Sequence, residues 1–127
     1  MALDRDRVSR WITAYEGLWR EGRSRDLGDL FTEDATYRAS PSAAPLRGLA
    51  AIRRWWDAET DPAEGWRMTT EVLAVDGDVA IARLDVRYSA PAERRYLDLW
   101  ILRFAPDGRC VAFEEWYWTP EFYAEVD

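Results

Sequence analysis

The chain has 127 residues, a formal net charge of −7 and 48% hydrophobic residues, among them eight tryptophans. This length fits one domain with a sizeable core, and an acidic chain without a block of basic residues argues against nucleic-acid binding. The chain has one cysteine, no histidine and no lysine. It therefore cannot form an internal disulfide, a Ser-His-Asp triad or a lysine Schiff base. The residue types left for proton transfer are Asp, Glu, Tyr and Cys.

Three helices and a short strand are predicted in the first half of the chain. Apolar residues at helical spacing predict an amphipathic helix over residues 4–21, with Asp4 as its N-cap and Gly22 as its stop. Ser24 is expected to cap a short second helix. The remaining features are a strand over residues 35–39, a loop over 40–45, and a third helix that Gly48 opens and Asp61-Pro62 ends.

From Trp66 onward the pattern is that of strands. The expected strands cover residues 66–75, 79–89, 96–105 and 109–118, and the turn signals between them are Asp76-Gly77, residues 90–92 and Pro106-Asp107-Gly108. This order predicts a single α+β domain over residues 1–127, in which three N-terminal helices pack on a strongly curved, mostly antiparallel sheet. Curvature leaves a concavity between helices and sheet, where small-molecule sites usually lie.

The last two predicted strands each place one carboxylate within an otherwise apolar, largely aromatic row. Because side chains alternate faces, the rows are Tyr96, Asp98, Trp100, Leu102 and Phe104 on one strand, and Val111, Phe113, Glu115 and Tyr117 on the other. A lone acid on a buried face destabilises the fold unless it is paired or protonated. We therefore expect a pocket in which Asp98 or Glu115 is the general base.

Strand register leaves alternatives open for these acids. A shift of one residue turns Glu114 inward instead of Glu115, although the apolar neighbours of Glu115 favour Glu115. Asp98 can instead form an ion pair with Arg83 or Arg87 on the adjacent strand.

The strand over residues 79–89 has a charged row and an apolar row. The charged row is Arg83, Asp85 and Arg87, and the apolar row is Ala82, Leu84, Val86 and Tyr88. Only one row can face the pocket in a regular strand, and the alternation favours the apolar one. If the charged row faces inward, Arg83 is a candidate for stabilising negative charge.

Aromatic residues supply the candidate walls of the pocket. The expected core and ligand-binding residues are Trp19, Trp56, Trp100 and Phe113, and the tyrosines that can donate a hydrogen bond to a ligand are Tyr15, Tyr37 and Tyr117. Trp116 and Trp118 fall on the opposite face, where exposed aromatic residues suggest a dimer contact.

The sequence shows no metal-binding or phosphate-binding motif, so we expect no metal and no cofactor. The N-terminal segment lacks an apolar signal core, no apolar run approaches the ~20 residues that span a membrane, and a single cysteine fits a reducing compartment. We expect a cytoplasmic protein that binds neither nucleic acid nor membrane.

Three stretches of the sequence resemble the nuclear-transport-factor-2-like superfamily, in particular its SnoaL-like bacterial members. They are LFTEDATYRASP at residues 30–41, LRGLAAIRRWW at residues 46–56 and DGRCVAFEEWYW at residues 107–118. The resemblance implies a cone-shaped fold with a deep apolar pocket, often paired as a homodimer through the sheet. It leaves the activity open, because this fold hosts isomerases, cyclases, hydrolases, dehydratases and non-catalytic binders.

The residues resemble different enzyme subfamilies in part. Ketosteroid isomerases carry an Asp base after the first strand, where this chain has Ala39-Ser40-Pro41, and an oxyanion-holding acid where it has Trp100. Tyr15 matches their helix-borne tyrosine. Limonene-type epoxide hydrolases carry Arg-x-Asp on a middle strand, similar to Arg83-Leu84-Asp85, and an acid on the last strand, similar to Glu115. SnoaL-type polyketide cyclases use a carboxylate base in the same general area.

Together these features predict a cofactor-independent enzyme of isomerase, cyclase or epoxide-hydrolase type that acts on a small hydrophobic, oxygenated molecule. Glu115 or Asp98 is the expected base, and a tyrosine hydroxyl or Arg83 is expected to stabilise negative charge. The alternatives are a non-catalytic ligand-binding or accessory dimeric domain, and a structural module with a filled core. An acid that lies unpaired in a real cavity favours the enzyme, whereas an acid locked to an arginine favours the binding domain.

Overall fold

The computed structural model describes residues 2–59, 65–89 and 93–119. The elements in chain order are α1 (Arg5–Glu21), the 3-10 helix η1 (Ser24–Asp29), β1 (Phe31–Arg38), β2 (Leu46–Arg47), α2 (Leu49–Ala58), β3 (Trp66–Asp76), β4 (Val79–Tyr88), β5 (Arg94–Phe104) and β6 (Cys110–Trp118). None of the described helices is long and apolar enough to cross a bilayer.

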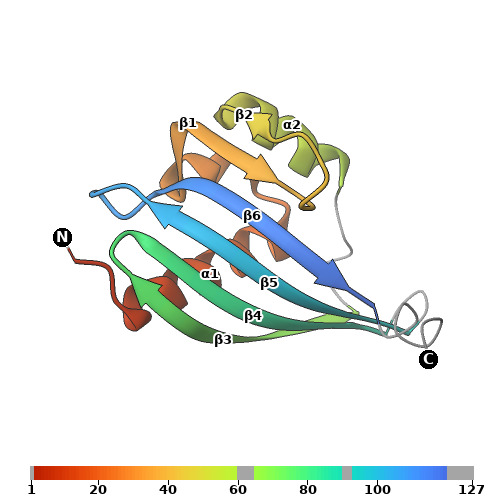
Figure 1. Ribbon diagram of the computed structural model, residues 1–127. Helices are drawn as coiled ribbons and strands as arrows, with labels where there is room; N and C mark the ends of the chain where they lie inside the picture. Colours follow the sequence, from red (N-terminus) through yellow and green to blue (C-terminus); the bar gives the residue numbers. More distant parts are fainter. Residues whose placement is uncertain (1, 60–64, 90–92, 120–127) are drawn as a thin grey trace.

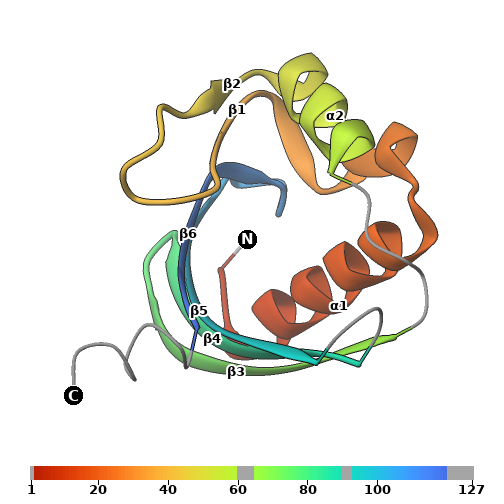
Figure 2. The same cartoon turned by 90° about the vertical axis from the view of Figure 1, so that its right-hand side faces the viewer.

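One six-stranded sheet, of order β2-β1-β6-β5-β4-β3, forms the body of the molecule (Figure 1). β1 and β6 run parallel, and the other neighbouring pairs of described strands are antiparallel. The sheet curves around α1 without closing, and α2 lies beside β1 (Figure 2). The structure confirms the predicted α+β class, with three helices packed on a curved, mixed sheet.

α1 forms where the sequence predicts it. The Asp4 side chain accepts a hydrogen bond from the backbone N–H of Arg7 at 2.8 Å, which satisfies a free donor of the first turn. Gly22 ends the helix with a φ of 65°, in the left-handed region that glycine adopts readily. The buried face of the helix carries Val8, Trp11, Ile12 and Tyr15. This face aims Tyr15 at the interior of the curved sheet.

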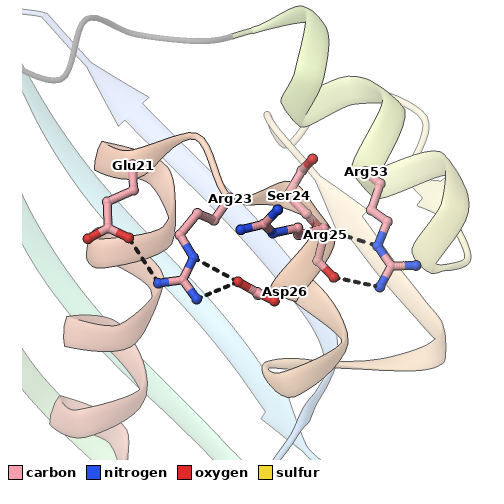
Figure 3. Close-up of polar contacts among 6 residues, drawn as sticks. All are labelled: Glu21, Arg23, Ser24, Arg25, Asp26 and Arg53. Atoms are coloured by element: carbon pink, nitrogen blue, oxygen red, sulfur yellow. Dashed lines mark hydrogen bonds and ion pairs between the residues drawn. The ribbon is translucent and has the colours of Figure 1, made fainter.

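The second helix differs from the prediction at its start. Ser24 is the first residue of η1 rather than its cap, and Arg23 before it makes no side-chain capping bond. Arg23 instead pairs with Glu21 and Asp26, and Arg53 of α2 donates hydrogen bonds to two carbonyl oxygens of η1 at 3.3 and 3.2 Å (Figure 3). These bonds hold α2 against η1 and so position the two tryptophans of α2.

Other boundaries shift by a few residues. β1 begins at Phe31, four residues before the predicted start, and the turn between β3 and β4 lies one residue later than predicted, at Gly77-Asp78. The short strand β2 was not predicted. The predicted helix stop at Asp61-Pro62 and the predicted turn at residues 90–92 lie outside the described residues.

A bulge near the start of β6 decides which of its residues face inward. Cys110 and Ala112 pair with consecutive residues of β5, so Val111 between them is an extra residue. Cys110 and Phe113 are both buried as a result, whereas Val111 is only half-buried. The prediction that Val111 shares the inner row is therefore wrong. From Phe113 onward the alternation resumes, and Glu115 faces inward as expected.

The outer face of β5 and β6 exposes an apolar patch of four residues. They are Leu99, Ile101, Trp116 and Trp118, and each is 37–38% exposed. The two tryptophans therefore lie on the face opposite the core, as the alternation predicts. The homodimer through this sheet stays a prediction.

Candidate functional site

A cavity of about 290 Å³ is lined by residues of α1, α2, β1 and the inner face of β3 to β6. Nine of the fourteen residues that line it are aromatic. The aromatic residues are Tyr15, Trp19, Tyr37, Trp55, Trp66, Tyr88, Tyr96, Trp100 and Tyr117, and the others are Glu16, Met68, Val86, Asp98 and Glu115. The cavity thus combines an aromatic wall with a small number of acids.

A larger hollow of about 830 Å³ lies at the other end of α1, where the tips of the hairpins meet the start of the helix. Its acidic residues, Asp78 and Asp107, are exposed to solvent. Exposed carboxylates keep water as their partner, so the smaller cavity is the place where an acid is taken out of water.

The two acids of the smaller cavity are neighbours on the inner face of β5 and β6. Asp98 lies opposite Tyr117 and Glu115 lies opposite Trp100, so the carboxyls occupy diagonal positions on one face. Because they lie close together in a site taken out of water, each carboxyl perturbs the pKa of the other. Oε2 of Glu115 also accepts a hydrogen bond from Nε1 of Trp100 at 2.8 Å.

No arginine of the described residues forms an ion pair with either carboxyl. Asp98 is 6% exposed, and its Oδ1 has no hydrogen-bond partner among the described residues. The alternative in which Asp98 pairs with Arg83 or Arg87 is therefore not adopted.

The pair retains a proton at neutral pH. Burial, together with the charge of Glu115 and the hydrogen bond to it, raises the pKa of Asp98 to about 9. Burial also raises the pKa of Glu115, but the hydrogen bonds from Trp100 and Asp98 oppose that rise. Because Asp98 lowers the pKa of Glu115 while Glu115 raises that of Asp98, Glu115 is the carboxyl that ionises first and Asp98 keeps its proton.

Two tyrosine hydroxyls complete the polar part of the cavity. The Oη atoms of Tyr15 and Tyr37 lie 2.6 Å apart. Burial raises the pKa of both phenols well above the ordinary value, and the charge of Glu115 raises them further. The Trp56 indole lowers the pKa of Tyr37, although its N–H has no hydrogen bond of normal geometry among the described residues. Both phenols stay protonated, so they are hydrogen-bond donors rather than bases.

Most of the predicted site residues come together in this cavity. Those that line it are Glu115, Asp98, Tyr15, Trp19, Tyr37, Trp100 and Tyr117. Trp56 and Phe113 are 3% and 1% exposed and lie behind the lining, where they support the aromatic wall without forming its surface.

Arg83 lies outside the cavity. Its guanidinium pairs with Glu71 at 2.6 Å on the exposed face of the sheet, whereas Leu84 beside it is fully buried. Asp85 shares the outer face and pairs with Arg95 at 2.8 Å. The apolar row of β4 faces inward, as the alternation favours, so Arg83 cannot stabilise charge in the pocket and the Arg83-Leu84-Asp85 motif turns both of its charged residues away from it.

Sequence reasoning missed part of the lining, namely Glu16, Trp55, Trp66 and Met68. Tyr96, and Val86 and Tyr88 of β4, belong to rows that were predicted to face the core. Trp66 and Met68 alternate in the same way on β3, so their shared face could have been read from the sequence. Their contact with the cavity depends on the curvature of the sheet, which the alternation does not encode.

Replacing Trp100 with phenylalanine should raise the pKa of Glu115 further. The substitution removes the indole N–H that stabilises the ionised carboxylate while keeping an aromatic ring in place. A carboxylate-resolved NMR titration measures the shift. Trp116→Phe is the matched control, because it removes a similar bond to Glu114 on the outer face. An unchanged pKa of Glu115 in Trp100→Phe would contradict this assignment.

The fold resembles that of several solved enzymes. The epoxide hydrolase/cyclase-like enzyme SalBIII, described in pyran ring formation in the polyether salinomycin, has a TM-score of 0.69 and 17% identity, over 91% of this chain and 93% of that chain. A steroid delta-isomerase from Pseudomonas aeruginosa has a TM-score of 0.65 and 20% identity, over 94% of this chain and 84% of that chain. An LEH-like epoxide hydrolase of M. tuberculosis has a TM-score of 0.63 and 11% identity, over 85% of this chain and 80% of that chain. At these identities the likeness concerns the fold alone.

The sequence comparisons agree with the fold. No curated protein sequence matches the chain significantly. The family described as SnoaL-like domain matches residues 8–113, which is most of the 127-residue chain. The predicted resemblance is thereby confirmed: the chain belongs to the SnoaL-like domain family.

Proposed function

We propose that the chain is a cofactor-independent enzyme that uses the Asp98–Glu115 pair for acid–base chemistry on a small hydrophobic, oxygenated molecule. One observation carries the proposal: two carboxyls lie at diagonal positions in an aromatic-lined cavity, and no arginine of the described residues forms an ion pair with either of them. Acids whose environments push their pKa values away from the ordinary range are a recurring feature of acid–base sites.

The two carboxyls suit opposite roles. Glu115 ionises first and takes a proton from a carbon acid or from a hydroxyl nucleophile, while Asp98 holds a proton that it can give to a substrate oxygen. The hydroxyls of Tyr15 and Tyr37 are hydrogen-bonded to each other, so one of them donates to the other and the second donates to that oxygen as negative charge develops on it. Isomerisation, cyclisation and epoxide opening can each use a base and an acid placed in this way. The names of the structurally similar proteins, an isomerase and epoxide hydrolases, support this range of reactions.

Turnover of a panel of small hydrophobic ketones and epoxides tests the proposal. Exchange of protons beside a ketone for solvent deuterium, followed by NMR, detects proton abstraction, and mass spectrometry detects ring opening. Glu115→Gln is expected to lower the rate by about 10²–10⁴-fold, the usual contribution of a positioned base. Glu114→Gln is the matched control, because this neighbour lies on the outer face and bonds Trp116.

Two outcomes would contradict the proposal. Full activity in Glu115→Gln would remove the carboxyl from the mechanism. Binding of panel members by the wild-type protein without any exchange or ring opening would favour the alternative, a ligand-binding domain that uses the same cavity.

A further inference from the structure

The cavity offers a ligand two neighbouring carboxyls and a largely aromatic lining. Once Glu115 ionises, the Asp98–Glu115 pair holds one proton and carries one negative charge. No arginine of the described residues forms an ion pair with it. A buried carboxylate without a cation destabilises the protein. A ligand that brings a cation removes that penalty, whereas a neutral ligand leaves it in place.

The walls favour the same kind of ligand. Nine lining residues are aromatic, and the face of an aromatic ring is the negative end of its quadrupole. Rings of this type attract ammonium and guanidinium groups, and sets of them recognise quaternary ammonium ions. The charged residues that line the cavity are all acids, namely Glu16, Asp98 and Glu115, and most of the other lining residues are aromatic.

The chain's own cations already lie on some of these rings. The Cζ atom of Arg20 lies 3.7 Å from the ring centroid of Trp66, and that of Arg94 lies 4.8 Å from the centroid of Tyr88 and 6.0 Å from that of Tyr96. Arg20 is balanced by Glu16 at 2.9 Å, and Glu16 itself lines the cavity. The arginine beside the cavity therefore does not neutralise the carboxyl pair at its base.

We propose that the ligand of this cavity carries a positive charge on an apolar body, as a tertiary or quaternary amine does. This inference rests on the site of the proposed function and names its substrate class: a hydrophobic amine that also bears the oxygen on which the carboxyls act. The cation lies against the ring faces within reach of Glu115, and the apolar remainder fills the cavity. An anionic analogue is repelled by the same carboxylate.

Paired binding probes that differ only in charge test the inference. Benzyltrimethylammonium carries the cation, and neopentylbenzene is its neutral isostere with carbon in place of nitrogen. Binding is followed near pH 8 by the fluorescence of the tryptophans that line the cavity. Glu115→Gln is expected to weaken the cationic probe about tenfold or more and to change the neutral probe by less than about twofold. Glu114→Gln, on the outer face, should leave both unchanged.

Glu115→Asp keeps the negative charge and should still bind the cationic probe better than the neutral one. This variant therefore separates the effect of losing the charge from the effect of disturbing the structure. Equal weakening of both probes in Glu115→Gln, or a wild-type protein that binds the neutral probe and not the cation, overturns the inference. Turnover is not part of this measurement. A cation preference without turnover in the ketone and epoxide panel contradicts the proposed function alone, and turnover without a cation preference contradicts this inference alone.

Discussion

Replacing Asp98 with asparagine is expected to stabilise the folded protein at pH 8. Burial raises the pKa of Asp98 to about 9 in the folded state, against about 3.9 in an unfolded chain. Between these values the folded protein holds a proton that the unfolded chain has lost, so stability falls as pH rises through this window. Asparagine resembles the protonated acid, donates an N–H to Glu115 in its place, and does not titrate.

The size of the effect should depend on pH. The free energy of unfolding of Asp98→Asn minus that of the wild type is expected to reach on the order of 2 kcal/mol at pH 8 and to shrink toward zero as pH falls toward the unfolded pKa. Denaturant unfolding at a series of pH values measures this difference. A variant that is less stable than the wild type at pH 8, or a difference that does not vary with pH, would contradict the protonated state of Asp98.

Asp85→Asn is the control of opposite sign. Hydrogen bonds from Arg95 and Arg87 lower the pKa of Asp85 to about 2, despite a smaller effect of burial in the other direction. Its ionised form therefore stabilises the folded state at pH 8, and that contribution is lost as pH falls through the folded pKa. Asparagine at this position should destabilise the protein at pH 8, although only modestly because the pair is partly exposed.

The carboxyl site could be predicted from the sequence because strands have a period of two. Asp98 falls in a row with Tyr96 and Trp100, and this row does face the cavity. The same rule separated Leu84, which is buried, from Arg83, which pairs with Glu71 on the outer face. Helix caps were equally readable, since Asp4 and Gly22 occupy the predicted ends of α1.

The contacts between strands could not be predicted in the same way. The bulge at Val111 leaves no local signal, yet it sets the register of all later residues of β6. Only that register makes Glu115 the partner of Trp100 and the diagonal neighbour of Asp98. The hydrogen bonds that divide the acid and base roles depend on this pairing and on side-chain rotamers, and neither follows from alternation.

Replacing Phe113 with alanine is expected to destabilise the protein by about 3–5 kcal/mol, the usual range for a buried aromatic residue. Phe113 is 1% exposed. Its ring is stacked on Tyr37 at 4.4 Å and on Tyr15 at 5.5 Å, and it meets Trp100 edge-on at 4.9 Å between centroids. One side chain of β6 thus joins rings from α1, β1 and β5, and its loss leaves a cavity among them.

Denaturant unfolding measures this loss as a change in the free energy of unfolding, provided that the m-value, the slope of that free energy against denaturant concentration, is the same in variant and wild type. Phe113→Leu is the control, because it keeps an apolar side chain of similar size and should cost less than about 1.5 kcal/mol. A loss below about 1 kcal/mol in Phe113→Ala would mean that the neighbouring rings collapse into the space. Together with the expected loss of stability, the Tyr15 and Tyr37 hydroxyls should lose their 2.6 Å contact in Phe113→Ala. The Phe113 ring supports the core and also holds these two donors, so Phe113→Ala should lower the free energy of unfolding and disturb the hydroxyl contact together. Tyr37→Phe keeps the stacked ring and removes only the hydroxyl, so it should remove the contact without the same loss of stability.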